Sequence, residues 1–306
     1  MSLKNIIKKA TGFNAFLKWQ RIENESQKLL TAKGIIHQMK NSYSNIKDFS
    51  DIEFSVFSQL GDDGIIQYLI HTLEIENKFF VEFGVQNYLE SNTRFLLMND
   101  NWSGLIMDGS SDFINFIQND YYYWKYNLKA KHLFITAENI NHAFEEENVK
   151  GEIGLLHIDI DGNDYWIWKA IQIIDPVIVI IEYNSGFGDE RSITVPYKPD
   201  FERYNAHHSG LLFGTSLQAL CDLAKEKDYA FVGCNSYGNN AYFVKKDKLK
   251  NIPEISCKEG YRFSYCRQNK DIEGNFTHQL DNDILKNFKE LKVFNLRSQK
   301  IENLNL

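Results

Sequence analysis

The sequence offers few residues for disulfide or metal cross-links, so the fold must be stabilised mainly by a buried core. Cysteine occurs only four times in 306 residues, with no CxxC spacing and no nearby paired histidines, at Cys221, Cys234, Cys257 and Cys266. That pattern predicts reduced thiols and disfavours a zinc site or a disulfide framework. Proline also occurs only four times, and no low-complexity linker is present, so we expect no sharp internal domain boundary.

Long apolar runs and an excess of positive charge are missing as well. The longest strongly apolar run, residues 177–181, is far too short to cross a bilayer, and the first residues contain no continuous apolar segment typical of a signal peptide. The formal net charge of -7 argues against broad nucleic-acid binding, which depends on a positive field. We therefore expect a cytoplasmic protein with no transmembrane segment and no nucleic-acid partner.

What is present is typical of a soluble globular protein, with 43% hydrophobic and 25% charged residues. Residues 1–50 predict an N-terminal helical extension with a basic amphipathic stripe. Such a stripe packs on its own domain, forms a homodimer contact or makes a weak contact with an anionic membrane surface, and the sequence leaves these open. Residues 51–250 predict the main domain. Residues 251–306 predict a charged C-terminal extension with one helical stretch at 282–292.

The main domain alternates short apolar runs with amphipathic segments. The runs suit strands buried on both faces and lie at 79–85, 104–108, 132–136, 153–160, 177–183, 229–234 and 241–244. Helical segments are expected between them near 63–74, 91–99, 112–119, 139–147, 163–173 and 215–227. This alternation predicts an α/β fold with a doubly wound, mostly parallel sheet of seven strands and helices on both faces. The last two runs are too close together for a crossover helix, so they predict an antiparallel terminal hairpin.

Two strand ends favour a cofactor that contains a nucleoside. The first strand is followed by Gly84, where the backbone can approach a ligand closely, and the loop continues to Asn87. The second strand ends at Asp108, about twenty positions further on, where a carboxylate can accept hydrogen bonds from both hydroxyls of a ribose.

Several segments resemble one family of enzymes, in the same order along the chain. Residues 57–64 (FSQLGDDG), 80–85 (FVEFGV) and 102–108 (WSGLIMD) resemble the methyltransferases grouped with FkbM, and EFGV is also similar to the macrocin O-methyltransferases. The resemblance continues to 238–243. It implies a class I, Rossmann-like fold with S-adenosylmethionine (SAM) as cofactor. Bulkier residues, among them Gln86 and Tyr88, stand where that family has its second and third loop glycines.

The same resemblance implies a set of cofactor-binding residues. Glu82 and Gly84 would lie beside the methionine part, Asp108 on the ribose and Glu138 in a turn beside the adenine, while Gln59 and Asp62 would close the site from the preceding helix. Asn87 is a further expected cofactor-binding residue.

Acidic residues gather at the ends of the fourth and fifth strands. Asp159 and Asp161 end the fourth, and Glu182 and Asn184 end the fifth. Adjacent parallel strands lie about 4.8 Å apart, so these side chains can converge on one hard cation, and their oxygens suit Mg²⁺. Macrocin-type and catechol-type methyltransferases hold Mg²⁺ at these strand ends. Alternatively, Asp161 and the nearby Asp164 only cap the helix that follows.

A proton acceptor is expected from Asp159 or from a histidine. His157 lies within the fourth strand and is alternatively a core residue. His207 and His208 lie in a long insertion at 185–210 with several tyrosines and arginines, which suits a cover over the acceptor. The alternative to a catalytic role is that these two histidines are simply exposed to solvent in a loop.

Together these observations predict a SAM-dependent O-methyltransferase, assisted by Mg²⁺, that acts on a small-molecule or glycan acceptor. That the acceptor is a sugar or a glycan precursor is implied by the family resemblance alone. One alternative is a non-catalytic, methyltransferase-like binding protein. The other is a nicotinamide-dependent oxidoreductase, which is disfavoured because no GxGxxG follows the first strand.

Overall fold

The computed structural model describes residues 13–305, and the chain divides into two compact units, residues 1–46 and 47–306. In the first unit, helix α2 (Phe13–Met39) is followed by the 3-10 helix η1 (Lys40–Asn45). The beginning of the predicted amphipathic stripe lies outside the described residues. In the part of the chain that is described, no helix combines the length and apolarity needed to cross a membrane.

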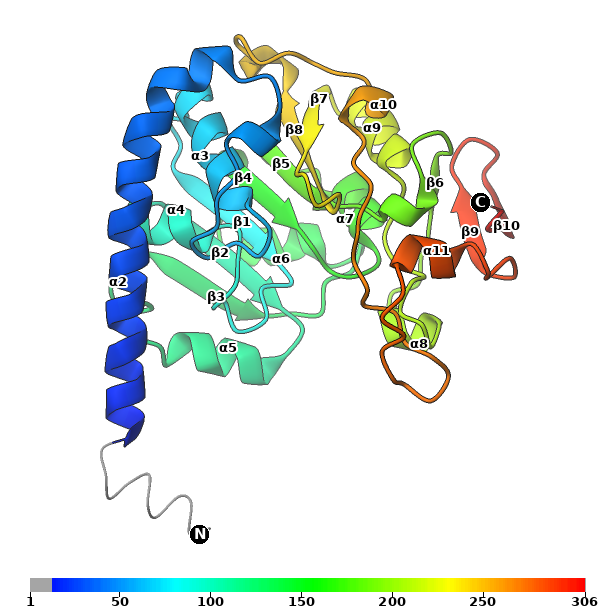
Figure 1. The fold of residues 1–306 in the computed structure, drawn as a ribbon, viewed down its shortest axis with the longest axis horizontal. Helices are drawn as coiled ribbons and strands as arrows, with labels where there is room; N and C mark the ends of the chain where they lie inside the picture. The colour runs from blue at the N-terminus through cyan, green and yellow to red at the C-terminus, as the bar shows by residue number, and fades with distance from the viewer. Residues whose placement is uncertain (1–12, 306) are drawn as a thin grey trace. The chain divides into compact units, whose positions relative to one another are not determined.

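The second unit is built on a seven-stranded sheet with the order β3-β2-β1-β4-β5-β8-β7 (Figure 1). Its strands are β1 (Phe79–Phe83), β2 (Ser103–Asp108), β3 (Leu128–His132), β4 (Gly151–Ile158), β5 (Ile174–Glu182), β7 (Tyr229–Cys234) and β8 (Asn240–Lys245). The first five pair in parallel, and β8 is antiparallel to both β5 and β7. The predicted sheet and its terminal hairpin are confirmed.

The third strand is the one strand that the apolar pattern misplaced. It was expected at 132–136, but β3 runs over Leu128–His132 and pairs Asp108 with His132 at its end. Because β3 is an edge strand, it is only partly buried and its sequence LKAKH carries two lysines. The apolar residues that follow, 133–135, therefore belong to the loop beyond the carboxyl end of the strand.

Helices cover both faces of the sheet. One face forms a continuous apolar core with α6 (Ile140–Glu146), α7 (Asp164–Ala170) and α9 (Leu217–Glu226), and it includes Phe243 of β8. The neighbouring Tyr242 points to the opposite face, as strand geometry requires. There its hydroxyl donates to Asp62 at the start of α3 (Asp62–Leu73). Helices α4 (Arg94–Asn99) and α5 (Ser111–Gln118) complete the connections between the first three strands.

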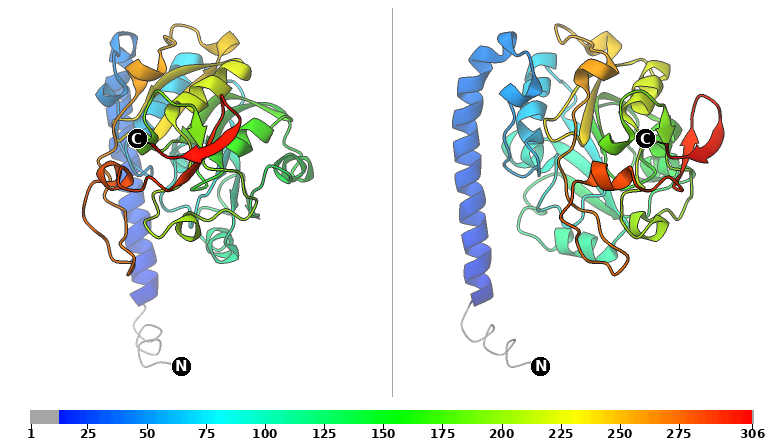
Figure 2. Two further views of the ribbon diagram at one scale, coloured as in Figure 1. Left: turned by 90° about the vertical axis from the view of Figure 1, so that its right-hand side faces the viewer. Right: turned by 45° about the vertical axis from the view of Figure 1, so that its right-hand side comes forward.

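A second, three-stranded sheet joins the insertion after β5 to the C-terminal segment. Strand β6 (Ile193–Thr194) pairs with β9 (Lys292–Asn295), which pairs with β10 (Lys300–Asn303), and the red hairpin of β9 and β10 lies beside β6 (Figure 2). The helix predicted at 282–292 is shorter than expected: α11 covers Asp281–Leu285, and the chain then turns into β9.

Short helical turns complete the unit. They are η2 (Phe49–Asp51), η3 (Ser185–Phe187), α8 (Arg203–Ala206), η4 (Lys246–Lys248) and α10 (Cys257–Gly260). The insertion thus contains short helices and a strand. It shares a small apolar core with the C-terminal segment, and this core includes Ile193 of the insertion and Leu285 and Val293 of the C-terminal segment.

Candidate active site

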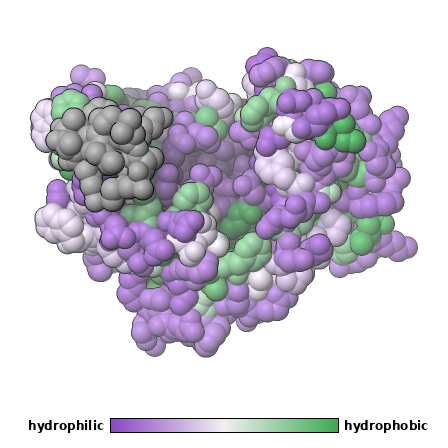
Figure 3. All heavy atoms as spheres, turned by 90° about the horizontal axis from the view of Figure 1, so that it is seen from below, coloured by the Kyte–Doolittle hydropathy of each residue, from purple (hydrophilic) through white to green (hydrophobic). Residues whose placement is uncertain are grey.

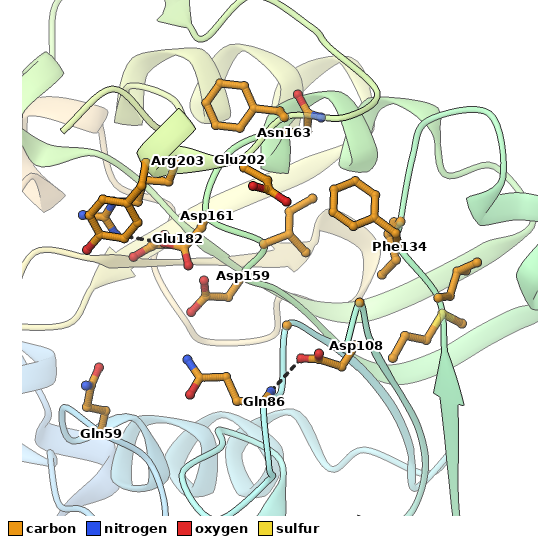
Figure 4. A pocket seen from close by; sticks show the side chains of 18 of the residues that line it. Gln59, Gln86, Asp108, Phe134, Asp159, Asp161, Asn163, Glu182, Glu202 and Arg203 are labelled. Atoms are coloured by element: carbon orange, nitrogen blue, oxygen red, sulfur yellow. Dashed lines mark hydrogen bonds and ion pairs between the residues drawn. The ribbon is translucent and has the colours of Figure 1, made fainter. Parts of the chain in front are cut away.

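A cavity of about 630 Å³ opens where the carboxyl ends of β1, β2, β4 and β5 meet, which is where open α/β sheets bind ligands. Seen from the side of α5 and α8, the surface is hollowed near its centre, and hydrophilic residues predominate around the hollow (Figure 3). The close-up shows Asp161, Glu182 and Arg203 close together on the cavity wall, with Asp159 between them and Asp108, and with Phe134 on the side away from Arg203 (Figure 4).

The end of β1 approaches the end of β4 so closely that only glycine fits. A Cβ at Gly84 would lie 1.7 Å from the backbone oxygen of Asp159, and Gly84 has a φ of +71°. Both features exclude a side chain, because left-handed backbone is unfavourable for L-residues and the clash is with backbone. The bare backbone of Gly84 therefore forms part of the cavity floor.

The loop after Gly84 keeps a glycine-like backbone although its other residues are bulky. Gln86 and Tyr88 have φ values of +48° and +60°. The Tyr88 side chain is fully buried and its hydroxyl lies 2.9 Å from Thr93 Oγ1, so packing holds the strained backbone in place. The two glycines that the family resemblance leads one to expect are thus replaced by residues that adopt positive φ.

Asp108 at the end of β2 ties this loop to the second strand. Its Oδ2 accepts a hydrogen bond from the backbone N–H of Gln86 at 2.7 Å, and its Oδ1 accepts one from that of Ser110 at 2.8 Å. Burial raises the pKa of Asp108. Each carboxylate oxygen has a second lone pair, so the group can still accept from a ligand in the cavity.

Glu82 lies behind the loop and organises it. Its carboxylate accepts hydrogen bonds from Ser91 Oγ at 2.5 Å and from the backbone N–H of Asn92 at 3.0 Å, and it lies 2.9 Å from His157 Nδ1. Burial alone would raise the pKa of Glu82, but these bonds and the His157 charge lower it below its usual value. His157 is thus the partner of a buried carboxylate.

A smaller cavity of about 110 Å³ continues from the main one toward α3. Gln59, Asp62 and Glu82 line it, together with Asn240 of β8. Asp62 Oδ1 accepts from Asn240 Nδ2 at 3.0 Å, while Asn240 Oδ1 is buried and has no hydrogen-bond partner among the described residues. This branch therefore presents oxygen acceptors and carboxylates to whatever enters it.

Two of the predicted cofactor residues do not line either cavity. Asn87 Oδ1 accepts from the backbone N–H of Leu89 at 3.0 Å, and Glu138 accepts from the Tyr197 hydroxyl at 2.6 Å. The apolar wall near Asp108 is formed instead by residues 133–135, which include Phe134. The misplaced third strand explains this difference, because the segment read as a strand is in fact the loop that borders the cavity.

The acidic strand ends converge. One carboxylate oxygen from each of Asp159, Asp161 and Glu182 lies within 4.8 Å of the others. Burial and the Asp161 charge raise the pKa of Asp159 to about 7, and burial and the Asp159 charge raise that of Glu182. Glu182 Oε2 is buried and has no hydrogen-bond partner within the described chain. Such an arrangement costs free energy unless a cation or a proton compensates it.

Two neighbouring polar residues have structural partners instead. Asn184 was predicted as a metal ligand, but its Nδ2 donates to the backbone oxygens of Leu211 and Phe213, at 3.0 and 3.1 Å. Its side chain is therefore not part of the acid cluster. Asp164 accepts backbone N–H bonds from Ile160 and Gly162, both at 2.9 Å, and starts α7. Asp164 therefore fixes the loop between β4 and α7, and it does not cap the helix, because Asn163 holds the N-cap position and no described side chain caps α7.

The insertion after β5 contributes different residues to the cavity from those predicted. The rings of His207 and His208 lie 4.1 Å apart, both lie against Phe288, and neither residue lines the cavity. Arg203 of α8 does line it, and its Nη1 lies 2.8 Å from Asp161 Oδ1 (Figure 4). The predicted histidine base therefore has no direct access to this cavity.

The C-terminal segment also reaches the cavity, through Gln268. Asp281 fixes this segment by accepting backbone N–H bonds from Gln268 at 3.1 Å and Asn269 at 2.9 Å. Tyr183 at the end of β5 donates to the backbone oxygen of Arg262 at 2.8 Å. No motif marks Gln268 in the sequence, because its position depends on these long-range contacts.

Comparisons with known proteins give distant structural neighbours only. An O-methyltransferase from Bacillus cereus with bound SAH is 12% identical, with 69% of this chain and 91% of that one covered and a TM-score of 0.40. A putative caffeoyl-CoA O-methyltransferase from Staphylococcus aureus is 13% identical, with the same coverage and TM-score. A SAM-dependent methyltransferase from Clostridium acetobutylicum is 11% identical, covering 70% of this chain and 98% of that one, with a TM-score of 0.39.

No protein-family model matches the chain, and no curated protein matches it. The resemblance to the FkbM and macrocin groups therefore stays a prediction.

Proposed function

We propose that the chain is a SAM-dependent O-methyltransferase. The observation that carries the proposal is that Asp108 and the bare backbone of Gly84, at neighbouring strand ends, border one cavity of ligand size. Ligand cavities typically measure about 300–1,000 Å³. An acidic residue at the second strand end and a close backbone approach at the first suit an adenosine that carries a charged substituent.

The cavity walls suit the parts of SAM. Asp108 would accept hydrogen bonds from the ribose hydroxyls, and Phe134 and its neighbours would contact the adenine. The branch lined by Asp62 and Asn240 would take the methionine end, since its unpaired carbonyl oxygen and carboxylates suit an ammonium group. SAM would supply the electrophilic methyl group.

The acid cluster fits a divalent cation. Asp159, Asp161 and Glu182 present hard oxygen donors, and the unpaired Oε2 of Glu182 is a buried group that a cation would satisfy. A bound Mg²⁺ would lower the pKa of an acceptor hydroxyl and orient it. Asp159 lines both cavities, so it lies between the proposed methionine and acceptor positions and is the proposed proton acceptor.

For the acceptor, we propose a sugar or a glycan precursor. The acceptor side of the cavity is lined by the aromatic residues Phe201 and Tyr204 and by the neutral amide of Gln268. Aromatic faces pack against the C–H faces of a sugar, while a carboxamide can both donate to and accept from hydroxyl groups.

The topology disfavours the oxidoreductase alternative. Dinucleotide-binding dehydrogenases typically have the strand order 3-2-1-4-5-6 with a glycine-rich first loop, whereas here the antiparallel β8 lies between β5 and β7. Fold alone does not fix function, so binding must be measured.

A thermal-shift titration with SAM, S-adenosylhomocysteine and NAD tests the proposal, because a ligand of the native state raises the apparent melting temperature. We expect SAM and S-adenosylhomocysteine to raise it and NAD to leave it unchanged. A response to NAD alone would favour an oxidoreductase, and no response to any of the three would favour a non-catalytic binding protein.

The cation requires a separate test. Glu182→Gln keeps the shape of the side chain and removes one charge. We expect this variant to bind SAM like the wild type but to bind Mn²⁺, measured by electron paramagnetic resonance, more weakly. Equal Mn²⁺ affinity in the two proteins would show that Glu182 is not a ligand.

A further inference from the structure

Arg203 provides the positive charge of the acid cluster. The cavity is lined by five carboxylates, and Arg203 is the single lysine or arginine among its described lining residues. Its Nη1 lies 2.8 Å from Asp161 Oδ1, and the Glu182 charge also acts on it. The acid cluster therefore already has a counter-charge that belongs to the protein.

The same guanidinium holds α8 in place over the cavity. Its Nε donates to the backbone oxygen of Gly210, and its plane lies over the Phe213 ring, with 3.8 Å from Cζ to the ring centroid. Asn205 and Ala206 donate backbone bonds to Glu202, so α8 is a single turn with few bonds of its own. Contacts of Arg203 are thus among those that fix this turn, together with the packing of Phe201 on Gly162 and of Tyr204 on Gly210.

The ion pair itself is easy to break. The side chain of Arg203 is 12% exposed but that of Asp161 is 55% exposed, so water screens the pair. A divalent cation held by Asp159, Asp161 and Glu182 would repel the guanidinium, and it would compete for the same Asp161 carboxylate.

We propose that Arg203 is the resident counter-cation of the acid cluster, and that a divalent cation bound there displaces it and releases α8 from Asp161. This inference rests on the cation site of the proposed function. The 201–210 segment then forms a wall of the cavity whose position responds to the cation. This wall narrows the acceptor side of the cavity when the cluster carries Arg203, and the acceptor side widens when the cluster carries the metal.

Mn²⁺ affinity in two Arg203 variants tests the competition. A unit charge about 5 Å from a divalent ion weakens its binding about tenfold even at the dielectric constant of water. Arg203→Met should therefore bind Mn²⁺ at least about tenfold more tightly than the wild type. Arg203→Lys keeps the charge and should stay close to the wild type.

Arg191→Met is the matched control. Arg191 belongs to the same insertion but pairs with Glu302 and donates to the backbone oxygen of Asn305, and it does not line the cavity. Its loss removes one positive charge from the protein without touching the cluster, so Mn²⁺ affinity should not change.

Hydrogen exchange in the wild type tests the release of α8 without any substitution. Mg²⁺ should speed amide exchange in residues 201–210, and in Arg203→Met the exchange should be fast already and insensitive to Mg²⁺.

Equal or weaker Mn²⁺ binding by Arg203→Met relative to Arg191→Met would overturn the proposal, as would slower or unchanged exchange in the wild type on adding Mg²⁺. If no protein in the set binds Mn²⁺, both this inference and the cation site fail, while the SAM titration still decides the methyltransferase proposal independently.

Discussion

Replacing Gly84 by alanine tests whether the close approach of β1 and β4 shapes the cavity. The added Cβ would lie 1.7 Å from the backbone oxygen of Asp159, whereas a Cβ essentially never lies within 3.0 Å of another residue's atoms. One of the two strand ends must therefore move by more than about 1 Å. Because Asp159 also belongs to the acid cluster, the movement would disturb both the cofactor side and the cation side of the cavity.

Two costs add up at this position. Holding a non-glycine residue in left-handed backbone costs about 1–2 kcal/mol, and overpacking a tight site costs about 1–3 kcal/mol more. We therefore expect Gly84→Ala to lower the free energy of unfolding by about 2–5 kcal/mol. A shift of about 1 Å in a binding site can cost a hundredfold in activity, so SAM binding should weaken strongly as well.

Gly151 at the start of β4 offers a control with the same backbone. Its φ is also +71°, but a Cβ there meets no atom within 4 Å. Gly151→Ala should cost only the conformational part, about 1–2 kcal/mol, and leave SAM affinity unchanged. Urea denaturation and calorimetry with SAM would measure both quantities for each variant. If Gly84→Ala is no less stable than Gly151→Ala, the steric reasoning is wrong.

Three further predictions concern single residues. Burial raises the pKa of Asp63 to about 6, so as the pH falls the native state binds this proton at a higher pH than the unfolded state does. The free energy of unfolding of the wild type relative to that of Asp63→Asn should therefore fall by up to about 3 kcal/mol as the pH rises from about 4 to about 7. A difference in urea denaturation that stays constant over this pH range would refute this. Gln86→Gly should raise the free energy of unfolding by about 1 kcal/mol because it relieves a positive φ, and a loss of stability in the same assay would contradict the strain argument. Asp108→Ala should weaken SAM binding by about 1.5–3 kcal/mol in calorimetry, and unchanged affinity in a folded variant would remove Asp108 from the site.

The sequence was sufficient to predict the central strands and the residues at their ends. Buried parallel strands are continuous apolar runs, and the carboxyl ends of such strands meet at one edge of the sheet. The sequence alone therefore assigns Gly84, Asp108, Asp159 and Glu182 to one region of the fold. The edge strand β3 could not be located in this way, because a partly exposed strand such as LKAKH lacks the apolar run.

Residues on the acceptor side depend on contacts that no local pattern encodes. The insertion was expected to contribute His207 and His208, but it turns through α8 so that Arg203 and Tyr204 line the cavity while the histidines lie against Phe288. Gln268 reaches the cavity because its segment is tied to β5 and to Asp281. Such pairings between distant segments are decided by tertiary packing, not by composition or periodicity.

The contact between the end of β5 and the C-terminal segment links the completion of the cavity to the order of protein synthesis. Every strand of the large sheet has been made once β8 ends at Lys245, whereas the wall that carries Gln268 needs contacts such as that from Tyr183 to Arg262, 79 residues further along the chain. Chains emerge from the ribosome with the N-terminal part first, and closing a long loop costs entropy. The cofactor side of the cavity should therefore form on the nascent chain before the acceptor side can close, so the two halves of the site mature one after the other.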